Sequence, residues 1–146
     1  MRASSTWGRT PRQSIEQECA RRGRSEVVDG CLALLAEQPA DPHLVVALGG
    51  PPARWVLTGG QGGPAYWLRV WAARGLLWAW EDRALPAVVS ALDDEAWRVR
   101  EMALRVVARH GLGDALQAVA RRQDDPVPRV RAAADRALVR LTRDRA

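Results

Sequence analysis

The sequence lacks lysine, asparagine and phenylalanine, and it has one isoleucine, one tyrosine and two histidines. All 22 of its basic residues are therefore arginines, which indicates a composition biased toward arginine, alanine, glycine and valine. Part of the net charge of +5 is background from this bias. The planar guanidinium nevertheless suits phosphate and carboxylate groups better than an ammonium does. The composition thus permits an anionic partner without demanding one.

Cysteine, histidine and long apolar runs are also scarce. Cys19 and Cys31 are too few for a disulfide framework, so we expect buried free thiols. Together with His43 and His110, these cysteines lack the short paired spacings of zinc sites. Their spacing also suggests no Ser-His-Asp or Cys-His catalytic arrangement. We therefore predict no metal, no cofactor and no catalytic residues. The polar start of the chain and the absence of an apolar run of about 20 residues predict a cytoplasmic protein without a membrane span.

A repeat of 31 residues organises the second half of the chain. Residues 93–103 overlay residues 124–134, and the same interval leads back to residues 62–72. Between these stretches, residues 83–92 and 112–122 carry apolar positions at helical spacing, so each repeat is predicted to form two helices. Asp94 and Asp125 stand where N-caps are expected, Pro126 suits a first helical turn, and Gly111 suits a helix end.

These residues resemble the HEAT-repeat family, particularly its short bacterial, phycobilisome-lyase-like form. In that family an Asp in the turn precedes a Val-Arg pair in the second helix, and Asp and Arg form a ladder between repeats. Asp94 with Val99-Arg100 and Asp125 with Val130-Arg131 match this pattern, whereas Gly63 replaces the Asp before Leu68-Arg69. The resemblance implies an all-α fold, a right-handed α-α superhelix of the HEAT-like solenoid type.

The N-terminal third follows the period less clearly. Thr10-Pro11-Arg12-Gln13 has the form of a capping box that opens a helix through about Arg22. Ser25 is a candidate cap for a second helix, and Asp41-Pro42 for a short third one that ends at Gly49-Gly50. We expect disorder over residues 1–9, degenerate helices over 10–52 that cap the stack, and three HEAT-type repeats over 53–146.

A helical wheel of the second helices predicts one shared face of arginine and tryptophan. We call it the Arg/Trp stripe. Its members are Trp67, Arg74, Trp78, Arg98, Arg105, Arg109, Arg129, Arg136 and Arg140. If the second helices line the concave side, as the resemblance implies, this stripe is a basic groove. The alternative is a solvated face whose charge is partly neutralised by Glu101 and Asp135.

The Trp residues between 55 and 80 belong either to the core or to an interface. Trp71 shares a column with Met102 and Ala133 and is expected in the core, whereas Trp67 and Trp78 fall on the stripe. The Gly-rich segment 59–64 lacks the Lys-Ser/Thr of a phosphate-binding loop and is interpreted as a connection.

The leading hypothesis for function is a non-enzymatic protein-interaction scaffold that binds an acidic or extended protein. Nucleic-acid binding of a DNA-repair type is the alternative. DNA glycosylase-like and bilin lyase-like activities rest only on the resemblance to HEAT-like proteins. Trp78 and Trp80 with Glu81 and Asp82 put aromatics beside carboxylates, but they match no glycosylase site residue by residue.

Overall fold

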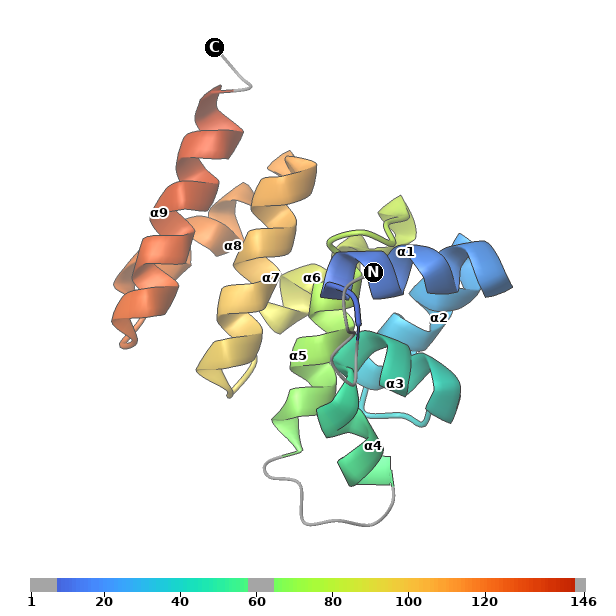
Figure 1. Ribbon diagram of the computed structural model, residues 1–146. Helices are drawn as coiled ribbons and strands as arrows, with labels where there is room; N and C mark the ends of the chain where they lie inside the picture. Colours follow the sequence, from blue (N-terminus) through green and yellow to red (C-terminus); the bar gives the residue numbers. More distant parts are fainter. Residues whose placement is uncertain (1–7, 58–64, 144–146) are drawn as a thin grey trace. The chain divides into compact units, whose positions relative to one another are not determined.

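The computed structural model describes residues 8–57 and 65–143, and the side chains of residues 55–57 are not included in this description. The described residues form α-helices and short 3-10 helices and contain no strand, which confirms the predicted all-α class. The chain divides into two compact units, Met1–Glu81 and Asp82–Ala146 (Figure 1). Most of the predicted disordered segment, and the whole of the Gly-rich segment 59–64, lie outside the described residues.

The N-terminal unit begins with the pair α1 (Pro11–Arg22) and α2 (Arg24–Leu35). Thr10 caps α1 as predicted. Its hydroxyl accepts from the Gln13 backbone N–H at 3.1 Å, and the Gln13 side chain accepts from the Thr10 N–H at 3.0 Å. The prediction that Ser25 caps the second helix is wrong: α2 begins at Arg24 after Gly23, whose φ of 96° suits glycine.

Three more helices complete this unit: α3 (Pro42–Gly49), α4 (Pro51–Leu57) and α5 (Tyr66–Gly75). Asp41 caps α3 as predicted, since its carboxylate accepts from the His43 N–H at 2.7 Å. The helix α4 lies near the start of the first predicted repeat, which begins at residue 53 and was expected to contain two helices. Because α5 packs against both α2 and α3, the helices share one core.

Small residues allow this core to pack closely. A methyl group added at Gly30 of α2 would lie 1.9 Å from Leu44 Cδ2, and one added at Gly75 of α5 would lie 2.7 Å from Leu48 Cδ2. Cys31 is fully buried beside these residues, and its thiol is free as predicted. The glycines therefore set the spacing between α2, α3 and α5.

The C-terminal unit contains two helical pairs. Its first pair is η1 with α6 (Asp82–Ala84 and Leu85–Ala91) followed by α7 (Trp97–His110). Its second is η2 with α8 (Gly113–Ala115 and Leu116–Arg121), then η3 (Arg122–Asp124) and α9 (Pro128–Arg143). The buried face of α7 is apolar, since Val99, Ala103, Val106 and Val107 are at most 1% exposed.

The ends of α7 and α9 differ in part from the prediction. Gly111 ends α7 in the left-handed conformation with φ 61°, as expected. Asp94 and Asp125 are not N-caps, however, because the helices begin at Trp97 and Pro128. Each Asp accepts instead from the N–H two residues ahead, at 2.8 and 2.9 Å. Pro126 likewise precedes α9, and these Asx turns leave the carboxylates able to reach arginines.

Candidate functional site

Two neighbouring helices of the C-terminal unit carry six residues of the predicted Arg/Trp stripe. In Figure 1, α7 and α9 lie side by side and run in the same direction, and they pack closely against one another. We call their shared cationic surface the α7–α9 arginine face. Its members are Arg98, Arg105, Arg109, Arg129, Arg136 and Arg140. Arg98 and Arg140 are half-buried and the other four are exposed.

Trp97 anchors one end of this face. The guanidinium carbon of Arg98 lies 4.4 Å from the centroid of the Trp97 ring, and that of Arg129 lies 5.5 Å from it. Both distances are within cation–π range. Arg129 Nε also donates to Glu101 Oε2 at 3.1 Å, although 70% of the Arg129 side chain remains exposed. Two helices thus hold two cations in fixed positions around one aromatic ring.

Sequence reasoning missed Trp97 as a site residue. The signal that identifies it is the 31-residue period, which aligns Trp97 with Tyr66 and Pro128 at the first position of a second helix. A residue there can reach across to the neighbouring helix.

Two carboxylates near the arginine face, those of Glu101 and Asp135, are engaged by other side chains. Glu101 is engaged by Arg129. Asp135 accepts from Gln123 Nε2 at 3.2 Å, which directs it toward η3. Within the part of the chain that the structure describes, Arg105 and Arg136 form no ion pair. The surface between them therefore keeps its positive charge.

The ladder arginine Arg100 has a structural role, as predicted. Arg100 Nε and Nη2 donate to the two carboxylate oxygens of Asp125 at 2.8 and 3.0 Å. Arg122 Nη1 donates to Asp125 Oδ2 at 3.1 Å. These bonds join one repeat to the next. Since the Asp125 side chain is fully buried, it is not accessible to a ligand.

The remaining stripe residues belong to the N-terminal unit, where Arg74 and Trp67 have partners. Arg74 Nη2 donates to the carbonyl oxygen of Leu48 at 2.6 Å, at the end of α3. Trp67 stacks on Trp71 with ring centroids 6.4 Å apart. Trp71 is 6% exposed, which confirms its predicted place in the core, whereas Trp67 and Trp78 are half-buried.

Across residues 8–57 and 65–143, no group of three or more His, Cys, Asp or Glu side chains is placed to hold a metal ion. No helix in these ranges is both long and apolar enough to cross a membrane.

A family model of HEAT repeats matches residues 55–139, more than half of the chain. No curated protein matches, and neither does any solved structure.

Proposed function

Because the chain belongs to the HEAT-repeat family, whose members are commonly protein-interaction scaffolds, we propose that it is a non-enzymatic binding module. Its α7–α9 arginine face holds an acidic protein partner. The family match begins at residue 55, which supports a division into N-terminal helices over 10–52 and repeats over 53–146. The helices before the repeats then cover the end of the stack.

The pair of cations around Trp97 is the observation that carries this proposal. Arginine and tryptophan are the residues most enriched among those that dominate binding energy. Arg98 and Arg129 are already positioned against the ring, so less side-chain freedom is lost when a partner docks. Arg105 and Arg136 extend the same cationic surface by about two helical turns, or roughly 10 Å.

A charge-reversal experiment tests the face. The variant combines Arg105→Glu with Arg136→Glu, and the matched control combines Arg12→Glu with Arg121→Glu, which changes net charge equally on exposed residues elsewhere. The probes are a labelled oligoglutamate peptide and a labelled DNA duplex, each titrated at several salt concentrations. We expect the face variant to weaken peptide binding about 30-fold or more, because like charges then oppose one another. The control should stay within about twofold of wild type.

Two outcomes contradict the proposal. If the control weakens peptide binding as much as the face variant, net charge alone explains the interaction. If the duplex binds more tightly than the peptide and its affinity falls steeply with salt, the partner is a nucleic acid, because phosphate contacts release counterions. Affinity capture with wild type and both variants then identifies natural partners that depend on the face.

A further inference from the structure

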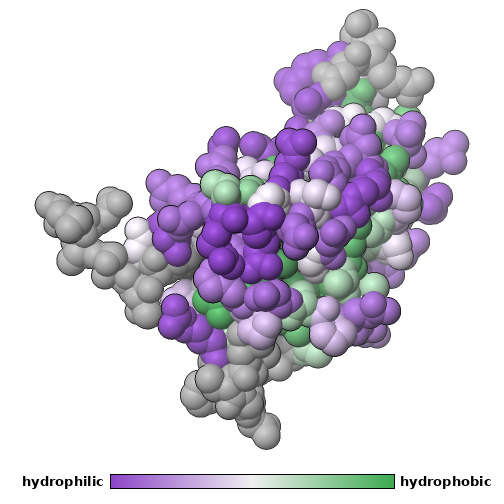
Figure 2. Space-filling view, turned by 90° about the vertical axis from the view of Figure 1, so that its right-hand side faces the viewer, coloured by the Kyte–Doolittle hydropathy of each residue, from purple (hydrophilic) through white to green (hydrophobic). Residues whose placement is uncertain are grey.

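A cleft of about 820 Å³ lies in the N-terminal unit. Its lining comes from α1 and the segment before it, from α3, and from α4 with the glycine before it. Ser14 Oγ donates to the Ala47 carbonyl at 2.8 Å and so joins α1 to α3 along this lining. The volume falls within the range of roughly 300–1,000 Å³ that is usual for small-molecule sites. Figure 2 looks onto the side where Figure 1 draws these helices, and hydrophilic residues cover most of its centre.

The charge in the cleft is predominantly positive. Arg9, Arg21 and Arg54 line it together with His43, and Glu18 is the only acidic residue among the lining side chains. The arginines come from three places in the chain: before α1, at the end of α1, and in α4. Among the described residues, Arg9 and Arg54 form no ion pair.

Glu18 does not offset this charge, because two arginines already bind it. It is 4% exposed, and it accepts from Arg21 Nη2 at 3.1 Å and from the neighbouring Arg22 Nε. Burial by itself raises the pKa of Glu18, but the hydrogen bonds from both arginines outweigh this and hold it below its ordinary value. One buried carboxylate thus faces two guanidinium groups, and an excess positive charge remains.

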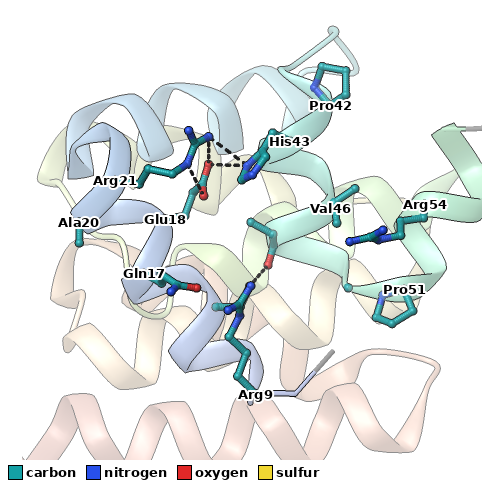
Figure 3. Close-up of a pocket in the computed structure, with 13 residues that line it drawn as sticks. Arg9, Gln17, Glu18, Ala20, Arg21, Pro42, His43, Val46, Pro51 and Arg54 are labelled. Carbon is teal, nitrogen blue, oxygen red and sulfur yellow. Dashed lines mark hydrogen bonds and ion pairs between the residues drawn. The ribbon is translucent and has the colours of Figure 1, made fainter. Parts of the chain in front are cut away.

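Glu18 also orients the donors that line the cleft. Figure 3 shows Glu18, Arg21 and His43 pointing toward one another. Arg21 Nε and Nη2 are held by Glu18, while the described residues offer its Nη1 no hydrogen bond. His43 Nδ1 lies 3.0 Å from Arg21 Nη2 and 3.2 Å from Glu18 Oε2.

We propose that this cleft binds a small organic anion, in which a phosphate or carboxylate group is joined to an apolar body. The guanidinium groups of Arg9, Arg21 and Arg54 bind the anionic group, since their planar forks match its oxygens. Pro42, Val46 and Pro51 give the cleft an apolar wall for the rest of the molecule. The site is separate from the α7–α9 arginine face, which belongs to the other compact unit.

The test is an NMR titration of the full chain with three probes. Phenyl phosphate and benzoate share a ring and differ in the anionic group, and inorganic phosphate lacks the ring. We expect saturable shifts at Arg21, His43 and Arg54 with at least one of the ring-bearing probes, and the tighter one identifies the preferred anion. Arg9→Gln with Arg54→Gln should weaken its binding about tenfold or more. Arg12→Gln, on the same α1 but outside the cleft lining, should leave it unchanged.

Three results would overturn the inference. One is the absence of saturable shifts at probe concentrations up to about 20 mM, which exceeds the dissociation constant of even a weak specific site. Another is an equal loss of binding in Arg12→Gln, which would show a general effect of charge. The third is equal affinity for inorganic phosphate, which would exclude a role for the apolar wall. Arg9 and Arg54 are exposed, so their variants keep the fold, and circular dichroism checks this. None of these substitutions alters the α7–α9 arginine face. A negative result for the cleft therefore does not bear on the proposed function, which the charge-reversal experiment tests separately.

Discussion

Removing the Asp125 carboxylate should strongly destabilise the C-terminal unit. Its two oxygens accept four hydrogen bonds, at 2.8 and 3.0 Å from Arg100, 3.1 Å from Arg122 and 2.9 Å from the Val127 N–H. Asp125→Ala leaves Arg100 with 10% of its side chain exposed and no counter-ion. An uncompensated buried charge of this kind costs about 3–5 kcal/mol. Asp125→Asn should cost less, because an amide oxygen can still accept from Val127.

Glu37 provides the matched control. Its carboxylate accepts from Arg69 Nη1 at 3.0 Å, and Arg69 is a buried arginine at the same repeat position as Arg100. However, 71% of the Glu37 side chain is exposed. Water can replace the carboxylate there, so Glu37→Ala should cost less than about 1 kcal/mol. Both variants remove a carboxylate from a buried arginine, and they differ in the burial of that carboxylate.

Urea unfolding, followed by far-UV circular dichroism and tryptophan fluorescence, measures both variants. For a slope typical of small proteins, Asp125→Ala should lower the midpoint by an amount on the order of 1–3 M. If Asp125→Ala costs no more than Glu37→Ala, the ladder does not hold the repeats together and the reasoning is refuted.

Acid gives an independent measurement of the same interaction. Burial raises the pKa of Asp125, but hydrogen bonds from Arg100 and Val127 and the charges of Arg100 and Arg122 outweigh it, so the pKa lies below its ordinary value. A depressed pKa contributes stability that is fully present above the unfolded value of about 3.9 and is lost as the pH falls through the folded value. Asp125→Asn should lack this part of the acid-induced loss. An identical pH profile for wild type and Asp125→Asn would contradict the assignment.

Two further predictions concern the small residues of the core. Gly30→Ala should destabilise the N-terminal unit by about 1–2 kcal/mol, because the added methyl group meets Leu44. The methyl group of Gly113→Ala meets nothing within 4 Å, so this variant should be neutral or stabilising by about 0.5 kcal/mol. Urea midpoints compare the two variants, and equal effects would contradict the packing argument. Burial raises the pKa of Cys31 to about 12, so at about pH 8 a thiol reagent should label the half-buried Cys19 first and reach Cys31 only on unfolding. Mass spectrometry of the labelled peptides follows both thiols, and faster labelling of Cys31 would refute this order.

Local patterns in the sequence predicted most of the fold. The capping box at Thr10 and the Asp41-Pro42 pair place the starts of α1 and α3 correctly, because a cap depends on residues within one turn. The 31-residue period predicted α7 and α9 in the same way. It placed their starts too early, since the side chain of each Asp accepts from the N–H two residues ahead, and that of Asp125 also accepts from Arg100.

Long-range contacts could not be predicted from spacing. Glu18 and His43 are 25 residues apart in the sequence and meet only because α1 packs on α3. The bond from Arg74 to the Leu48 carbonyl depends in the same way on how α5 packs against α3. Periodicity identifies the face of a helix on which a residue lies, but the partner of that residue is set by tertiary packing.

The arginines of the repeats show how position divides one residue type into different roles. Arg100 and Arg131 make the same local bond, in which Nη1 donates at 2.8 Å to the carbonyl of the Asp in their own turn. Arg100 also reaches the Asp of the following repeat and is buried, whereas Arg131, with no further repeat after it in the described chain, is exposed. Arg105, one turn beyond Arg100 on another side of α7, contributes only its charge to the surface. Because a composition rich in arginine fills all three positions alike, net charge cannot locate a binding face here. The position of each arginine within the repeat can locate such a face, and it identifies the α7–α9 arginine face.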